Sequence, residues 1–155
     1  MKIITRQLVA QVSAAARQSP RLRTNYNFHP SDESRCHRLL NAIEPGSYIR
    51  PHRHLDPEKD EAFILMSGRL GIVTFTDDGT VAETAMLSHA GGNLAVEIPH
   101  GVCHTALALE PGTLFYETKA GPYRQLNKDE MVTWAPEESD PQAQDYLLQL
   151  RSMFD

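Results

Sequence analysis

Short apolar segments separated by turn residues make up the chain between Arg38 and Lys119. Turns are marked by Pro45-Gly46, Asp77-Asp78-Gly79, Gly91-Gly92 and Glu110-Pro111-Gly112. Runs of this length that end in such turns are typical of antiparallel strands. The expected strands cover residues 39–43, 47–54, 61–66, 69–75, 81–87, 94–98, 102–109 and 113–118. So many strands with no helix between them predict an all-β fold, a jelly roll or barrel.

Helices are expected only at the two ends of the chain. Thr5 is a good N-cap for a helix that carries one apolar stripe and ends before Pro20. Near the other end, Ser139 or Asp140 can cap a second helix that has Pro141 in its first position. We therefore expect a single domain over 1–155, with a helical and irregular lead-in (1–37), a β-barrel (38–119), and a loop followed by a helix (120–155).

Residues 21–37 show no clean periodicity and leave two interpretations open. An irregular segment would use its asparagine and histidine side chains to satisfy its own backbone. If the segment is extended instead, Asn25, Asn27 and His29 alternate along it and would share one side. In that case we expect these three side chains to line the mouth of a pocket.

The composition excludes several classes of partner. The chain has 155 residues, a formal net charge of −5 and an isoelectric point near 5.8, with no basic run. These values argue against binding to nucleic acid or to an anionic membrane surface. No apolar run approaches the roughly 18 residues that indicate a transmembrane helix. The two cysteines cannot form a disulfide framework, so we expect a cytoplasmic protein.

A candidate metal site begins with His52 and His54. The two residues are two apart, so both imidazoles leave the same face of an extended strand. Glu61 opens the next apolar run, after a polar loop that contains Pro57. Two imidazoles and a carboxylate brought together across a hairpin are good ligands for a divalent transition metal.

His104 is the fourth candidate ligand. It lies near the start of a strand, after a turn that contains Pro99 and Gly101. Three histidines and one carboxylate would leave open positions on a five- or six-coordinate metal, as in a reactive site rather than a closed structural one. Iron, manganese, nickel, cobalt and zinc are all compatible with this ligand set.

These residues resemble the two sequence motifs of the cupins. The first motif, Gly-x5-His-x-His followed by Glu-x6-Gly, is met by Gly46, His52, His54, Glu61 and Gly68. The gap before the glutamate is longer than the usual three or four residues. The second motif, Gly-x5-Pro-x-Gly-x-x-His-x3-Asn, is met by Pro99, Gly101 and His104. Two positions depart from it: Gly92 lies one residue too far upstream of Pro99, and Ala108 stands where asparagine is common.

The resemblance extends over nearly the whole chain to the WbuC-like cupin-fold metalloproteins, which are associated with bacterial surface-polysaccharide gene clusters. It is carried by segments 21–29, 51–54, 96–99, 104–105, 119–123 and 134–137. Cys103 departs from it, because tryptophan is expected beside the second-motif histidine. The resemblance implies a double-stranded β-helix, a jelly roll, that holds a divalent metal through His52, His54, Glu61 and His104.

Two further residues are candidates for substrate binding. Arg50 has the same parity as His52 and would hold an anionic substrate beside the metal, unless Pro51 breaks the alternation and leaves it on the surface. Glu117 has the parity of Phe115 and could orient a ligand or act as a base. A buried pair between Glu117 and Lys119 or an arginine is an equally good interpretation.

Two hypotheses for function follow. In the first, the metal acts on a sugar or another small polar metabolite, for isomerisation or epimerisation or for oxygen-dependent chemistry. In the second, a non-catalytic binding protein or sensor uses the metal to anchor its ligand. Because no second catalytic pair stands out, whether the chain is an enzyme stays open. The cupin resemblance also implies a homodimer.

Overall fold

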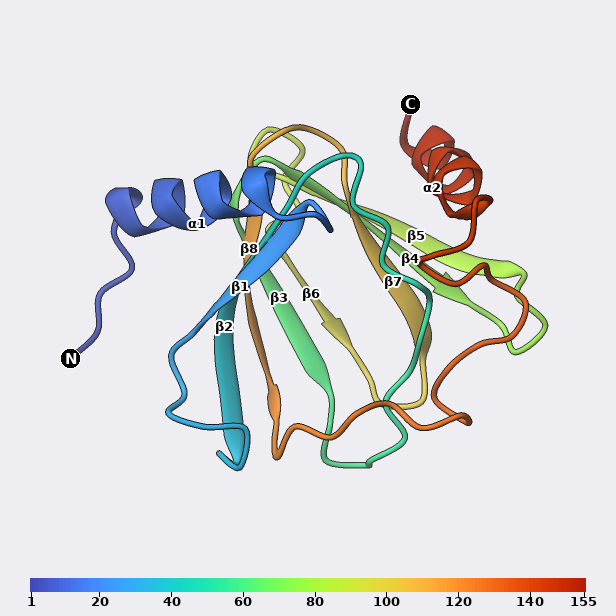
Figure 1. Ribbon diagram of the computed structural model, residues 1–155, viewed down its shortest axis with the longest axis horizontal. Coiled ribbons are helices and arrows are strands. Elements are labelled where there is room, and N and C mark those ends of the chain that lie inside the picture. The colour runs from blue at the N-terminus through green and yellow to red at the C-terminus, as the bar shows by residue number, and fades with distance from the viewer.

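Two antiparallel sheets face one another in the computed structural model, which describes residues 1–155 (Figure 1). The larger sheet has the strand order β1-β2-β8-β3-β6 and the smaller one β5-β4-β7. The strands are β1 (Arg23–Asn27), β2 (Cys36–Ile43), β3 (Glu61–Ser67), β4 (Arg69–Phe75), β5 (Val81–Ser88), β6 (Ala95–Ile98), β7 (Cys103–Ala108) and β8 (Thr113–Ala120). The all-β jelly roll that the sequence predicts is confirmed.

The main core lies between the two sheets. Along β4, Leu70 and Ile72 face inward, whereas Val73 and Phe75 face the other side of the strand, as the period of two requires. The buried side chains of this core are Ile43, Phe63, Leu65, Leu70, Ile72, Leu87, Ile98, Ala106, Ala108 and Phe115. The facing apolar sides of the two sheets therefore supply most of the burial that holds the domain together.

Gly68 makes the tight connection between β3 and β4. Its φ of +78° is a conformation that glycine adopts without steric penalty. A Cβ at this position would lie 2.6 Å from the Cα of Thr113, so any side chain would collide with β8. The turn and the close approach of Thr113 therefore explain why glycine is required at the last position of the first cupin motif.

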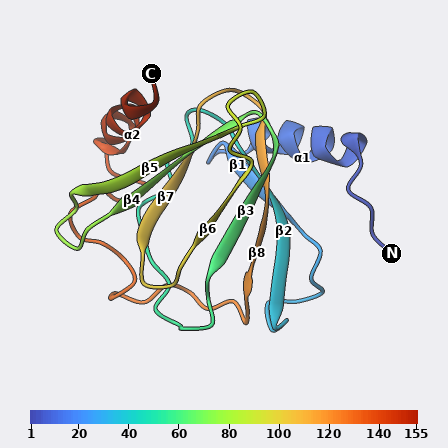
Figure 2. The ribbon, with the colours of Figure 1, turned by 180° about the vertical axis from the view of Figure 1, so that it is seen from behind.

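Each sheet carries one helix on its outer side (Figures 1 and 2). Helix α1 (Arg6–Gln18) is capped by Thr5, as predicted, and packs Val12 and Ala16 against β2 and β8. Helix α2 (Ala143–Arg151), which a short 3-10 turn (Ser152–Phe154) follows, packs Leu147 and Leu150 against β4 and β7. None of these helices has the length and apolar character needed to cross a membrane.

The structure corrects three details of the predicted elements. Residues 23–27 form strand β1 and pair with β2, so the irregular interpretation of the lead-in is wrong there. Residues 47–54 form no regular strand, although His52 makes isolated bridges to His104 and Met131. Helix α2 begins at Ala143 rather than at Pro141, because Asp140 accepts a hydrogen bond from the backbone of Gln142 and so forms a turn first.

The register of the larger sheet decides which side chains meet at its inner face. Glu61 of β3 lies opposite Lys119 of β8, and Glu117 of β8 lies between Phe63 and Leu39. Directly opposed residues in neighbouring strands point to the same face. Charged and polar side chains from β1, β2, β3 and β8 therefore gather at one place on an otherwise apolar face.

Candidate metal centre

His52 and His104 are brought together by the backbone. The two residues exchange both of their main-chain hydrogen bonds, with N–O distances of 3.1 and 2.9 Å. Opposed residues of an antiparallel bridge share one face, so both imidazoles point into the molecule. Their ring centroids lie 5.0 Å apart. One bridge is thus enough to place His52 correctly without a full strand over residues 47–54.

His54 and Glu61 complete the group. The Nε2 atom of His54 lies 3.2 Å from one carboxylate oxygen of Glu61, and His104 Nε2 lies 2.9 Å from the other. One ligand atom each from His52, His54 and Glu61 fall within 4.8 Å of one another. The four candidate ligands expected from the sequence therefore lie close together, with His104 in contact with Glu61 but outside the group of three whose ligand atoms fall within 4.8 Å.

The proton positions on two of the histidines follow from backbone contacts. The Nδ1 atoms of His52 and His104 lie 3.0 Å from the carbonyl oxygens of Arg50 and Val102. A carbonyl can only accept, so each Nδ1 carries a proton, and in a neutral ring Nε2 then keeps its lone pair. This arrangement, in which one ring nitrogen is held by a carbonyl and the other is free, is the usual one for metal-binding histidine.

Two buried atoms at the centre lack a hydrogen-bond partner, namely His54 Nε2 and Glu61 Oε2. The short contact between Glu61 Oε2 and His104 Nε2 sets two lone pairs against each other when His104 has its proton on Nδ1. Such a contact is unfavourable unless a proton or a cation lies between the two atoms. The donor set and its unpaired atoms fit a divalent cation.

Burial and neighbouring charges shift the pKa values of His52 and Glu61. Burial lowers the pKa of His52 to about 4, and the neighbouring His104 acts in the same direction. His52 is therefore neutral near pH 7, the state that binds a metal. Burial alone would raise the pKa of Glu61, but its contacts with His104 and His54 and the charge of Lys119 hold that pKa well below its usual range. Glu61 is therefore an anion.

Lys119 links the candidate ligand to a second buried carboxylate. Its Nζ atom lies 2.6 Å from Glu61 and 2.8 Å from Glu117, and Asn41 donates a hydrogen bond to Glu117 from the other side. Burial raises the pKa of Glu117, which Lys119 partly counteracts. The buried pair of Glu117 and Lys119 that the sequence allowed is present.

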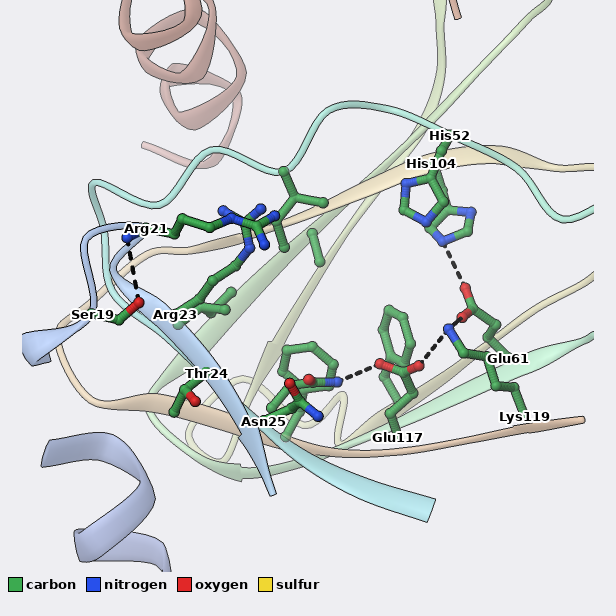
Figure 3. A pocket seen from close by; sticks show the side chains of 16 residues that line it. Ser19, Arg21, Arg23, Thr24, Asn25, His52, Glu61, His104, Glu117 and Lys119 are labelled. Carbon is green, nitrogen blue, oxygen red and sulfur yellow. Dashed lines mark hydrogen bonds and ion pairs between the residues drawn. The ribbon is translucent and has the colours of Figure 1, made fainter. Parts of the chain in front are cut away.

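A pocket of about 360 Å³ opens onto this group (Figure 3). Its walls include the apolar side chains of Ile43, Ile49, Phe63, Ala106 and Phe115, and its polar lining includes His52, Glu61, His104, Glu117 and Lys119. Ser19, Arg21, Arg23, Thr24, Asn25 and Asn41 line the remainder. The pocket has the size and mixed lining of a small-molecule site.

Not every residue singled out in the sequence reaches this pocket. Arg50 lines an adjoining hollow of about 550 Å³, where it donates hydrogen bonds to the Val132 carbonyl and to Glu137. Asn25 lines the pocket, as the extended interpretation predicts, but Asn27 is exposed and bonded to Asn25. His29 is buried elsewhere, stacked on His37.

Sequence reasoning named Lys119 only as a partner of Glu117, and it did not select Arg21, Arg23 or Asn41 for the pocket. For Lys119 a signal was available, because it continues the alternation of Phe115 and Glu117 on the inner face of β8. The arginines gave no such signal, since their position depends on a strand, β1, that has no apolar pattern of its own.

Comparison with known proteins agrees with the fold. KdgF from Halomonas sp. has a TM-score of 0.52 and 20% identity over 68% of this chain and 84% of its own. TT1209 from Thermus thermophilus has a TM-score of 0.54 and 20% identity, covering 77% and 97%. Procruciferin, an 11S globulin from Brassica napus, has a TM-score of 0.54 and 16% identity, covering 70% and 28%. No curated protein matches the chain.

The jelly roll is shared with these solved structures, and in this chain it carries a cluster of His52, His54 and Glu61 that could hold a metal. A family model described as a domain of unknown function (DUF6016) matches residues 4–87, and the chain belongs to that family. The matched region includes His52, His54 and Glu61, whereas His104 and Lys119 lie beyond it.

Proposed function

We propose that His52, His54, Glu61 and His104 bind one divalent transition metal, namely iron, manganese, nickel, cobalt or zinc. The observation that carries this proposal is the pair of buried atoms without a hydrogen-bond partner, His54 Nε2 and Glu61 Oε2, within one cluster of ligand atoms. Leaving such atoms unpaired costs about 1–3 kcal/mol each. A cation bound between them would remove that cost.

The ligand of this site is a small polar metabolite. A bound metal with open positions would supply a Lewis acid for a carbonyl or hydroxyl group, or an oxygen-activating centre. The pocket of about 360 Å³ suits a molecule the size of a monosaccharide. A larger molecule such as a nucleotide sugar would also need the adjoining hollow of about 550 Å³. With the WbuC-like resemblance, this favours a role in surface-polysaccharide metabolism, in isomerisation, epimerisation or an oxygen-dependent step.

Two side chains are assigned to the ligand itself. Glu117 faces the pocket and, because burial raises its pKa, is suited to hold a proton next to a ligand hydroxyl. Arg50 lines the adjoining hollow, where it would contact an anionic part of a longer ligand; its Nε is buried without a partner. Both roles depend on the ligand, so they are best tested after the metal.

A non-catalytic binding protein or sensor is the second candidate. The observation that favours it is the mutual engagement of Glu117 and Lys119. Two side chains that neutralise each other in this way are less available for acid–base chemistry than a free pair would be. In this case the metal would anchor the ligand and the pocket would select it, without turnover.

Elemental analysis of protein purified without chelator tests the metal. We expect about one metal ion per chain. We also expect metal affinity to fall at least tenfold in His52→Ala and in His104→Ala, because mutating even a residue that only supports a metal ligand lowers metal affinity about 10–100-fold. His89→Ala is the matched control, because His89 is exposed and outside the cluster. Wild-type protein without metal, and variants that load as the wild type does, would contradict the proposal.

Turnover separates the two candidates once metal is bound. Metal-loaded protein is incubated with sugars and nucleotide sugars, with and without oxygen, and products are followed by mass spectrometry. Product formation that His52→Ala abolishes supports the enzyme, whereas ligand binding without any product supports the sensor. The proposed homodimer is tested separately, by the mass of the protein in light scattering.

A further inference from the structure

We propose that Arg21 and Arg23 form a carboxylate-binding subsite in the same pocket, so that the natural ligand is a small carboxylic acid whose other end carries oxygen donors for the metal. This inference rests on the proposed metal for one end of the ligand only. It adds the chemical class of the ligand, and it assigns a role to two arginines that are not part of the metal centre.

Arg23 is held in place for this role. Its side chain is 15% exposed, and its Nη1 donates to the Tyr48 carbonyl at 2.9 Å and to Ser47 Oγ at 3.3 Å. Its Nη2 then points to Glu138 Oε1 at 2.5 Å. A guanidinium fixed on one edge by the protein presents its other edge for binding with little further loss of side-chain freedom.

Arg21 offers a second guanidinium to the same acceptor. Its Nε and Nη2 reach the two oxygens of Glu138 at 3.1 and 3.0 Å, the parallel pair of bonds typical of arginine with a carboxylate. Both arginines thus converge on one carboxylate group. The position of Glu138 shows that a planar carboxylate fits between them.

The position of the arginines connects this subsite to the metal centre. Arg21 and Arg23 line the pocket that also contains His52, Glu61 and His104. In Figure 3 the guanidinium groups lie on the side of the pocket away from Glu61 and the histidines. A ligand with a carboxylate at one end and oxygen donors at the other could span the two groups.

The charges of the pocket favour an anion. Its lining holds three cationic side chains, Arg21, Arg23 and Lys119, against two carboxylates, Glu61 and Glu117. Both of those carboxylates are already engaged by Lys119, so they do not neutralise the arginines. A divalent metal would add further positive charge.

Glu138 occupies the subsite, and a ligand carboxylate would have to displace it. It belongs to the segment between β8 and α2, outside any strand or helix, and its side chain is 38% exposed. The Arg21 and Glu138 side chains are 63% and 38% exposed, so solvent screens the ion pair between them. A ligand carboxylate that is also held by the metal would therefore displace Glu138 from the arginines.

Calorimetric titration with tartrate tests the subsite. Tartrate has two carboxylates and two hydroxyls, and threitol is the same skeleton without the carboxylates. With metal-loaded protein, we expect tartrate to bind about tenfold more tightly to Glu138→Gln than to the wild type, because the substitution removes a competing carboxylate. We expect tartrate to bind about tenfold more weakly to Arg21→Gln than to the wild type, because one charge-assisted contact is lost. Threitol should bind all three proteins equally. Arg21→Gln is preferred to Arg23→Gln because the Arg21 guanidinium has no hydrogen-bond partner besides Glu138.

The chain offers a matched control in Arg124 and Glu33, a second exposed pair with two parallel bonds, neither of which lines the pocket. Glu33→Gln and Arg124→Gln should leave tartrate binding unchanged. No tartrate binding in any protein, or equal binding in wild type, Glu138→Gln and Arg21→Gln, overturns the subsite. Repeating the titration on metal-depleted protein separates the two proposals, since binding that still depends on Arg21 supports the subsite even if the metal proposal fails.

Discussion

Lys119 is the residue on which the charge balance of the pocket depends. Two carboxylates, Glu61 and Glu117, are almost fully buried, and burial of an ionised carboxylate is strongly unfavourable unless a partner compensates it. Lys119 contacts both, and together they raise its pKa despite burial. It therefore stabilises the fold and also fixes one oxygen of Glu61, leaving the other directed at His104.

Replacing Lys119 by methionine keeps the length of the side chain and removes its charge. We expect Lys119→Met to lower the free energy of unfolding by about 3 kcal/mol, because breaking a buried ion pair leaves an uncompensated charge. Adding Glu117→Gln should restore part of that loss, since one of the two carboxylates is then neutral. Urea denaturation of the single and double variants measures both effects, and a single variant as stable as the wild type would contradict the assigned role.

At the level of single residues, the sequence selected the candidate metal ligands and not the groups around them. His52, His54, Glu61 and His104 could be selected because only histidine and carboxylate at suitable spacing provide this chemistry. Asn41, Arg21 and Arg23 could not, since asparagine and arginine occur on any surface and only the pairing of β1 with β2 brings them to the pocket. Arg50 shares the parity of His52, but the irregular chain at 47–54 directs it into the adjoining hollow.

Among the elements, helix α2 shows most directly that packing, rather than intrinsic helix propensity, stabilises a segment. It has nine residues and no side-chain cap, so it would be marginal alone. Leu147 and Leu150 bury it against Val73 and Leu107 of the smaller sheet. Gly71 of β4 leaves room for Phe154, whose ring would lie 2.8 Å from a Cβ at that position. The apolar spacing of the sequence predicts this helix, but only the turn at Asp140 decides where it begins.

The contribution of α2 can be measured with two leucines of the same helix. Leu150 is 2% exposed and Leu148 is 61% exposed. We expect Leu150→Ala to lower the free energy of unfolding by about 3 kcal/mol, from the lost burial and the remaining cavity. Leu148→Ala should change it by less than about 0.5 kcal/mol, as is usual for surface positions. Equal effects of the two substitutions in urea denaturation would show that α2 does not pack on the sheet in solution.

In the whole molecule, the apolar core between the sheets does not depend on the candidate metal ligands. The core between the sheets consists of apolar side chains from every strand except β1, and contains no candidate metal ligand. The order of the strands could be predicted only in outline, because turn residues mark where strands end but not which strands pair across the barrel. The site draws on both sheets and on the irregular segment 47–54, so it forms only once these parts are in place.

Removal of the metal should therefore weaken the protein without unfolding it. A metal that binds only the folded state stabilises it by about 2.7 kcal/mol at one hundred times its dissociation constant. For a chain of this size, that corresponds to a rise of about 5–10 °C in the unfolding temperature. We expect protein treated with a chelator to melt that much lower, to keep its circular dichroism spectrum at room temperature, and to recover when metal is restored. His104→Ala should show a smaller difference in melting temperature between its metal-loaded and metal-free forms than the wild type does, while His89→Ala should follow the wild type. A metal-free chain that loses its β-sheet signal at room temperature would show instead that the metal is required for the fold itself.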